Sequence, residues 1–361
     1  MAADLMPRLV GARAWTDDEP IECVAVVPDG PNVVSFTFRA PSGAWFDYRP
    51  GQFLTLELPV GAKPVHRTYT ISSSPSRPLT ITITVKAGGT SVGTRWMLDN
   101  LVSGMRIKAI GPGGIFVPDV PADRKLLLIS AGSGVTPMMS MITYRYDLGG
   151  DPDICFVQCA RRPSELVFRR QLEAMARRVP TIKLHYVVTE DDRYDTWTGY
   201  RGSFNQLMLG LMAPDYLDRE VYCCGPEPFM QTVREMLIGF GYDMDHYHQE
   251  AFTGPPVLTP ADAPELDDVV PDADASSQVI FSRSGESVTC TETDTILAVS
   301  RTAGLNIPSG CTFGVCGTCK VRKLSGDVHM VHNGGISEED IEAGYILACC
   351  SNPMGRVEID A

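Results

Sequence analysis

The sequence lacks any run of about 18 apolar residues, the length that a membrane-spanning helix requires. Its N-terminus, MAADLMPRLVGARAWTDDEP, also lacks the basic segment followed by an apolar stretch that marks a secretory signal peptide. Both absences lead us to expect a cytoplasmic protein. Residues 1–20 carry no other pattern, and we assign them to an N-terminal extension.

Positive charge is scarce. The chain has 31 Lys and Arg against 44 Asp and Glu, a formal net charge of -13. On average such a surface repels nucleic acid and anionic membranes, so we expect neither as a partner. A basic patch on another protein remains compatible with this charge.

The sequence divides at one segment that has no basic residue. Residues 253–277 contain five Pro and six acidic residues, which favour an extended linker over a long surface loop. The chain has 361 residues, 44% of them hydrophobic, which excludes disorder as the dominant state and indicates two or three domains.

The remaining segments differ in their pattern of apolar and turn-forming residues. Residues 21–117 hold short β-like runs separated by Pro and Gly, which predicts an antiparallel β-barrel or sandwich. Residues 118–252 alternate apolar runs with amphipathic stretches, the pattern of an α/β domain with a parallel sheet. Residues 278–361 start with a predicted hairpin, followed by a helix capped by Thr293 or Asp294.

The 11 cysteines include one informative cluster, C-x4-C-x2-C followed by a fourth Cys thirty positions later. In a reducing compartment such a cluster indicates a metal or redox centre rather than disulfides. The spacing is that of plant-type [2Fe–2S] sites, in which four thiolates hold two irons. The predicted ligands are Cys311, Cys316, Cys319 and Cys349.

Zinc is the alternative for these four thiolates. Structural zinc sites usually show two C-x2-C knuckles or Cys/His pairs, and this segment has a single C-x2-C. Cys350 is then a spare thiol, and we place His329 and His332 in a surface turn. With SGCTFGVCGTCKV and ILAC, residues 278–361 resemble plant-type ferredoxins, which implies a β-grasp fold.

A second motif suits a flavin. Arg67-Thr68-Tyr69-Thr70 combines a cation for phosphates, an aromatic ring to cover the flavin and a hydroxyl for its N5 atom. Strand alternation places Arg67 and Tyr69 on one face. Read alone, this tetrapeptide also fits an ordinary barrel strand.

A third motif suits a dinucleotide. Gly132-Ser133-Gly134 lies between the apolar run LLLIS and a helical stretch, where backbone amides can approach a pyrophosphate. Cys224-Gly225-Pro226 ends another apolar run, EVYCCG. Core packing is the alternative for Cys223 and Cys224.

Residues 21–252 resemble the ferredoxin–NADP reductase superfamily. The resemblance implies that the R-x-Y-T motif binds flavin and that Cys224 lies beside the nicotinamide. It gives Phe252 the role of covering the flavin ring. It also implies cofactor contacts from Thr84, Val85, Lys86, Val92, Gly93, Thr94, Thr136, Arg161, Gly225 and Pro226.

The loop before the predicted pyrophosphate helix lacks the Gly-rich, His-containing form of FMN-binding relatives, which favours FAD. Arg161-Arg162 could hold a 2′-phosphate and so indicate NADPH. Because NADH-dependent relatives also carry an Arg there, we predict NADH and leave NADPH open.

The whole of residues 15–361 resembles reductase components of two-component Rieske-type oxygenases, in the branch of glycine betaine, carnitine and stachydrine demethylases. MVHNGGISEEDIEAGYILACCSNP and VHRTYTISSSPSRP carry this likeness. It implies electron flow from NADH through FAD and the cluster to a terminal oxygenase acting on a quaternary amine. A reductase of a hybrid-cluster protein and a non-catalytic redox sensor are the alternatives.

Overall fold

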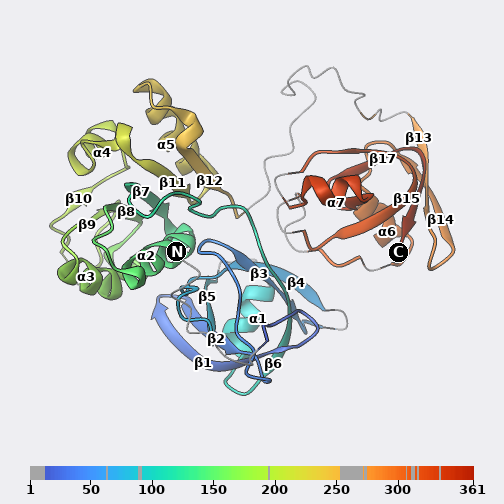
Figure 1. Cartoon of the computed structure of the whole chain (residues 1–361), viewed down its shortest axis with the longest axis horizontal. Helices are drawn as coiled ribbons and strands as arrows, with labels where there is room; N and C mark the ends of the chain where they lie inside the picture. The colour runs from blue at the N-terminus through green and yellow to red at the C-terminus, as the bar shows by residue number, and fades with distance from the viewer. Residues whose placement is uncertain are drawn as a thin grey trace. The chain divides into compact units, whose positions relative to one another are not determined.

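The computed structural model describes residues 13–361, except 62–63, 88–91, 194–195, 253–270, 272–274, 306, 310–313, 315–316 and 333–334. The described residues form three β-sheets with associated helices (Figure 1). Apart from residues 66–68 and 113, the first two sheets belong to one compact unit, and the third sheet belongs to the other. Within the described residues, no helix is long and apolar enough to cross a membrane.

The first sheet has six strands in the order β4-β3-β6-β1-β2-β5. Strand β1 pairs antiparallel with β2 and β6, and β2 pairs antiparallel with β5. Ile71, directly after β4, bridges Ile83 in β5, so the two edges of the sheet meet. This closure confirms the predicted antiparallel barrel. The elements are β1 (Ile21–Gly30), β2 (Val33–Arg39), β3 (Phe53–Leu58), β4 (Val65–Thr70), β5 (Ile81–Lys86), α1 (Val92–Asn100) and β6 (Arg106–Gly113).

Alternation along the strands builds the barrel core. In β2, Phe36 and Phe38 are fully buried and pack with Leu54 and Leu56 of β3. Met97 of α1 joins the same core, which fixes that helix against the barrel. Burying these side chains contributes about 2 kcal/mol each.

The second sheet is parallel throughout, in the order β10-β9-β8-β7-β11-β12, and confirms the predicted α/β domain. Its strands are β7 (Leu126–Ala131), β8 (Ile154–Ala160), β9 (Ile182–Val188), β10 (Tyr200–Arg201), β11 (Glu220–Cys224) and β12 (Tyr247–Glu250). Its helices are α2 (Val135–Leu148), α3 (Arg169–Arg178), α4 (Gln206–Met212) and α5 (Glu227–Gly239). Four short 3-10 helices are η2 (Gly132–Gly134), η3 (Pro163–Glu165), η4 (Tyr216–Asp218) and η5 (Met244–His246).

Helices cover both faces of this sheet. Leu126 and Leu128 of β7 pack on the side of α2 and α3, while Leu127 and Ile129 pack on the side of α4 and α5. Because both faces are covered, the strand is apolar at nearly every position, as in LLLISA. The carboxyl ends of these parallel strands form one edge, which is where α/β proteins bind ligands.

The third sheet has the order β14-β13-β17-β15-β16 and is mixed, because β13 and β17 run parallel. Its elements are β13 (Ser276–Phe281), β14 (Glu286–Thr291), α6 (Ile296–Thr302), β15 (Lys320–Met330), α7 (Glu338–Glu342), β16 (Tyr345–Leu347) and β17 (Ser351–Asp360). Strand β13 begins at Ser276, inside the segment predicted as linker. The rest of that segment, Pro271 and Ala275 apart, lies outside the described residues.

The N-cap predicted for the helix of this third domain was wrong by one or two positions. Thr295 caps α6, because its hydroxyl accepts a hydrogen bond from the Ala298 amide at 3.2 Å. The Asp294 carboxylate instead accepts from the Thr291 amide at 2.9 Å, which closes the turn before the helix.

Candidate active site

The flavin motif lies on β4, at one edge strand of the barrel sheet. Its Tyr69 hydroxyl lies 3.0 Å from the Thr94 hydroxyl of α1, so the strand brings together two of the sequence-predicted segments. Thr70 is buried, whereas Arg67 is half-buried and its guanidinium donates to the neighbouring His66 carbonyl at 2.7 Å.

The predicted pyrophosphate segment forms the first turn of α1, which begins at Val92. Gly93 and Thr94 are buried there, and Val92 is exposed. The first amides of a helix have no partner within the helix, so this turn can donate hydrogen bonds to a phosphate. The residues present therefore fit the diphosphate of a flavin dinucleotide.

The third predicted flavin segment, Thr84-Val85-Lys86, ends β5. The Thr84 hydroxyl lies 2.7 Å from that of Ser35 and 2.9 Å from that of Ser72, so it braces the loop after the flavin motif. Val85 packs in the barrel core. The Lys86 ammonium binds Glu165 of η3 at 2.6 Å, so its charge is directed at the second sheet's domain.

The predicted dinucleotide turn lies at the carboxyl end of β7. Gly132 has a φ of +56°, a conformation that side chains disfavour. A Cβ atom on Gly134 would lie 2.0 Å from the Cys224 carbonyl oxygen, so only glycine allows the helix start to approach β11 this closely. The Thr136 hydroxyl donates to the Ser133 carbonyl at 3.0 Å and closes the first turn.

Cys224 ends β11 at the same edge and is fully buried. Burial raises the pKa of its thiol well above the usual range, which keeps the sulfur protonated and neutral. In the register of the parallel sheet, Cys224 stands between Ser130 of β7 and Glu250 of β12. Gly225 follows closely against Ala131, and Pro226 is the N-cap of α5.

Sequence reasoning missed Glu250. Its side chain is buried, and burial raises the pKa of the carboxyl to about 8. Among the described residues, Glu250 Oε2 and Ser130 Oγ are buried without a hydrogen-bond partner, on either side of Cys224. An acidic residue ending the last parallel strand, two positions before Phe252, was the signal available in YHQEAF.

The last two predicted residues of this edge are exposed. Phe252, two positions after Glu250, leaves 44% of its surface accessible. Arg161 follows β8, and its guanidinium is also exposed. Both are available to a bound dinucleotide.

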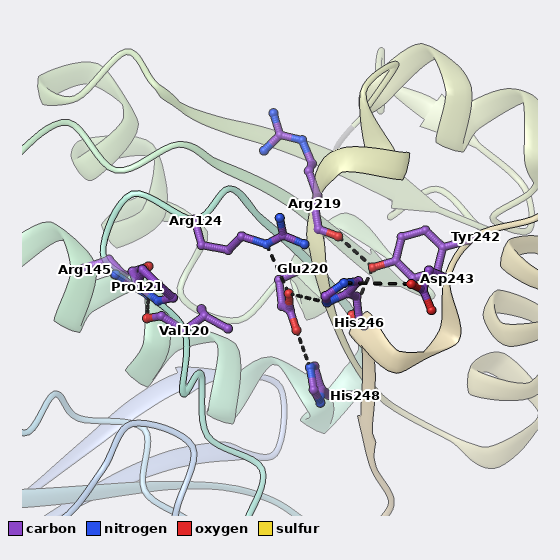
Figure 2. Close-up of polar contacts among 10 residues, drawn as sticks. All are labelled: Val120, Pro121, Arg124, Arg145, Arg219, Glu220, Tyr242, Asp243, His246 and His248. Carbon is purple, nitrogen blue, oxygen red and sulfur yellow. Dashed lines mark hydrogen bonds and ion pairs between the residues drawn. The ribbon is translucent and has the colours of Figure 1, made fainter.

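Strand β11 carries a second polar group at its opposite end, which Figure 2 shows. The buried Glu220 carboxylate lies 3.2 Å from Arg124 Nε, 3.1 Å from His246 Nδ1 and 2.6 Å from His248 Nε2. The His248 ring stacks on Tyr222 at 4.6 Å. This network fixes the start of β12 against β11 and lies away from the carboxyl edge.

Helix α2 also connects the dinucleotide turn to the flavin domain. Ser140 is buried, and its hydroxyl donates to the Ser73 carbonyl at 2.6 Å. Near the end of the helix, Asp147 accepts from Ser76 at 2.5 Å and from Arg77. The helix that starts at the dinucleotide turn is therefore fixed to the loop that follows the flavin motif.

In the ferredoxin-like sheet, Cys319 and Cys349 come together although 30 positions separate them. Both are buried, and the Cys349 amide lies 3.4 Å from Cys319 Sγ. Amide hydrogen bonds to sulfur are a feature of iron–sulfur sites, so these two residues fit a cluster. The other two predicted ligands, Cys311 and Cys316, lie outside the described residues. Within the described residues, no three His, Cys, Asp or Glu side chains form a group that could hold a metal ion.

The chain resembles known proteins along its whole length. An oxidoreductase FAD-binding domain family matches residues 27–117, an oxidoreductase NAD-binding domain family matches residues 128–235, and a 2Fe-2S iron-sulfur cluster binding domain family matches residues 279–354. All three assignments agree with the predicted cofactors.

Two relatives align over nearly their full length. The chain is 61% identical over 348 residues to the stachydrine N-demethylase reductase subunit of Rhizobium meliloti, covering 96% of this chain and 98% of that protein. It is 44% identical over 359 residues to the glycine betaine monooxygenase reductase subunit of Pseudomonas aeruginosa, covering 97% and 98%. The solved structure of phthalate dioxygenase reductase has the same fold, with a TM-score of 0.60 at 24% identity over 96% of this chain and 100% of that one.

Proposed function

Because the chain belongs to the family of reductase subunits that combine FAD-binding, NAD-binding and 2Fe-2S domains, we propose that it transfers electrons from NADH to an oxygenase that demethylates a quaternary amine. The observation that carries this proposal is the 61% identity to the stachydrine N-demethylase reductase subunit over 98% of that protein. Stachydrine is therefore the first substrate of the partner to test, and glycine betaine is the second.

In this proposal the barrel holds FAD. Arg67 supplies a cation, Tyr69 an aromatic ring and Thr70 a hydroxyl, while the first turn of α1 supplies amides for the diphosphate. When bound, FAD converts the two-electron hydride chemistry of NADH into single-electron transfer.

The carboxyl edge of the parallel sheet binds the coenzyme. The turn at Gly132–Gly134 donates amides to its pyrophosphate, and Cys224 presents a neutral, compact side chain where the nicotinamide lies. Glu250, with a pKa of about 8, is largely protonated at pH 7 and can donate a hydrogen bond there. Phe252 covers the flavin ring until the nicotinamide displaces it.

The third sheet holds the cluster, with Cys311, Cys316, Cys319 and Cys349 as thiolate ligands. A cytoplasmic location suits these thiols, and no disulfide joins any of the nine described cysteines. Because the chain has a net charge of -13, we propose that its partner is a protein electron acceptor, and neither nucleic acid nor a membrane.

Reconstitution tests the proposal. Purified holoprotein is combined with the partner Rieske-type oxygenase, NADH, oxygen and stachydrine, and formaldehyde release is compared with NADH consumption. We expect product only with all components present. Reduction of ferricyanide without any oxygenase turnover would contradict the assigned partner, and reduction of a hybrid-cluster protein instead would identify the alternative acceptor. A protein that NADH reduces without passing electrons to either acceptor would be a sensor.

A further inference from the structure

The two arginines after β8 raise the question of coenzyme choice, since an Arg at this edge can bind the 2′-phosphate of NADPH. In the structure, Arg162 is already engaged. Its Nε and Nη2 atoms both donate to Glu190 Oε2, at 3.1 and 2.9 Å. Glu190 follows β9, so the pair spans the carboxyl ends of two adjacent strands.

The backbone holds this pair in place. Ala160 and Val188, the last residues of β8 and β9, are partners in the parallel ladder. Beyond them, the Glu190 amide donates to the Arg161 carbonyl at 2.8 Å. The Glu190 side chain therefore starts from a fixed position beside the arginines, although about half of it is exposed.

Two further carboxylates follow Glu190, and each is anchored. Asp191 binds Arg201 at 2.5 Å, and that hydrogen bond lowers the pKa of Asp191. Asp192 accepts from the Ser164 amide at 2.6 Å and from its hydroxyl at 2.9 Å. The edge thus presents three successive acidic residues next to an arginine that is already paired.

This arrangement discriminates between the two coenzymes. The ribose of NADH has a free 2′-hydroxyl, which can donate a hydrogen bond to a carboxylate. The 2′-phosphate of NADPH has no proton to donate at neutral pH and carries nearly two negative charges, which adjacent carboxylates repel. Because Arg162 is paired with Glu190, its charge offsets less of that repulsion than a free guanidinium would, and Arg161 is the other, exposed cation at this edge.

We propose that Glu190 makes this reductase selective for NADH, by occupying Arg162 and by excluding a 2′-phosphate from the adenosine end of the coenzyme site. The inference rests on the proposed nicotinamide site at the carboxyl edge. It assigns a specificity role to Glu190, a residue outside the cofactor motifs.

The test compares E190Q with the parent holoprotein. Two probes report the adenosine end alone by calorimetry: 5′-AMP, and 2′,5′-ADP, which carries the extra phosphate. Flavin reduction with ferricyanide as acceptor gives kcat/KM for NADH and for NADPH. We expect E190Q to bind 2′,5′-ADP about tenfold more tightly and to raise kcat/KM for NADPH similarly, because a unit charge and a competitor for Arg162 are removed. The value for NADH should change little, since the glutamine oxygen still accepts a hydrogen bond.

Two variants complete the design. E190Q/R162A should lose the part of the gained affinity for 2′,5′-ADP that the freed guanidinium supplies and keep the part that comes from removing the Glu190 charge. E173Q is the matched control, as it removes the same charge from an Arg–Glu pair within α3. An unchanged ratio of 2′,5′-ADP to 5′-AMP affinity in E190Q, or a gain that survives R162A in full, would overturn the inference. A parent protein that oxidised neither coenzyme would instead contradict the proposed function.

Discussion

Asp147 accepts two hydrogen bonds from the Arg77 guanidinium, 2.9 Å from Nε and 2.8 Å from Nη2, across 70 positions of the chain. The pair joins the end of α2 to the loop that follows the flavin motif. With the Ser140 contact to the Ser73 carbonyl, it fixes α2 at two points along its length. Since α2 begins at the dinucleotide turn, this helix would set where the nicotinamide lies relative to the flavin in the proposed site.

We predict that D147N slows flavin reduction by NADH several-fold, while the affinity for 5′-AMP stays unchanged. The variant loses the bidentate pair, so the turn at the start of α2 samples more positions. Hydride transfer then slows, because small displacements of the reacting groups are costly. Stability should fall by about 1 kcal/mol or less, because Arg77 is largely exposed. Anaerobic stopped-flow absorbance measures the rate. D360N is the control, since Asp360 forms a comparable bidentate pair with Arg283 in the other compact unit. Equal rates in both variants would refute the role of Asp147.

The buried Glu250 carboxyl predicts a pH-dependent stability. Its pKa is about 8 in the folded protein against 4.5 in the reference state, so between these values the folded state binds a proton that the unfolded state has lost. Stability from this group is therefore present below pH 4.5 and falls as the pH rises to about 8. We expect E250Q to flatten this slope and to be more stable than the parent at pH 9. Thermal unfolding followed by release of flavin fluorescence measures it. E235Q, an exposed change on α5, should keep the parent slope, and a parental slope in E250Q would contradict the burial argument.

Gly134 predicts a large effect from a single methyl group. In G134A the new Cβ atom would meet the Cys224 carbonyl oxygen at 2.0 Å and the Gly225 nitrogen at 2.8 Å. Either α2 or β11 must move, which costs about 1–3 kcal/mol and disturbs the coenzyme edge. We expect a matching fall in stability and weaker binding of NADH, measured by calorimetry. G210A is the control: this glycine lies in α4 with open space around it, so alanine should stabilise the helix by about 1 kcal/mol. Comparable effects of the two changes would count against the close approach.

The neighbouring Cys349 and Cys350 give a prediction for the cluster. C349S should abolish the visible absorption of the iron–sulfur centre and the reduction of a one-electron protein acceptor such as cytochrome c. NADH-dependent ferricyanide reduction should persist, because the FAD-binding and NAD-binding family matches, residues 27–117 and 128–235, do not include the cluster segment. C350S should keep the full spectrum, as the Cys350 thiol is directed at the Leu347 carbonyl at 3.7 Å. Loss of the cluster in C350S but not in C349S would reverse the assignment, and bound zinc in place of iron would refute the cluster.

The local motifs were readable from the sequence because each depends on neighbouring residues. The turn Gly132–Gly134 follows a strand and starts a helix as predicted, and the Cys349 amide lies beside the Cys319 sulfur. The alternating β-like runs likewise form the barrel. In each case a periodicity or a spacing specifies the geometry.

The features that sequence reasoning missed depend on residues distant in the chain. The burial of Glu250 follows from its place beside Cys224 in the sheet, and no local pattern reports it. No sequence signal indicated that the Lys86 ammonium binds Glu165, 79 positions away, and the predicted contact of Lys86 with a cofactor stays a prediction. The choice of Thr295 as helix cap arose because Asp294 closes the preceding turn.

The two ends of the β11–β12 pair differ in how firmly side chains anchor them, and this difference has a practical consequence for protein engineering. At one end, Glu220 and its basic neighbours anchor the strands (Figure 2). At the other, Glu250 ends β12 in a buried position, and Phe252, two positions later, is 44% exposed. A library that varies only the residues after β12 can therefore search for reductases that accept synthetic nicotinamide analogues, while the anchored end preserves the yield of folded protein.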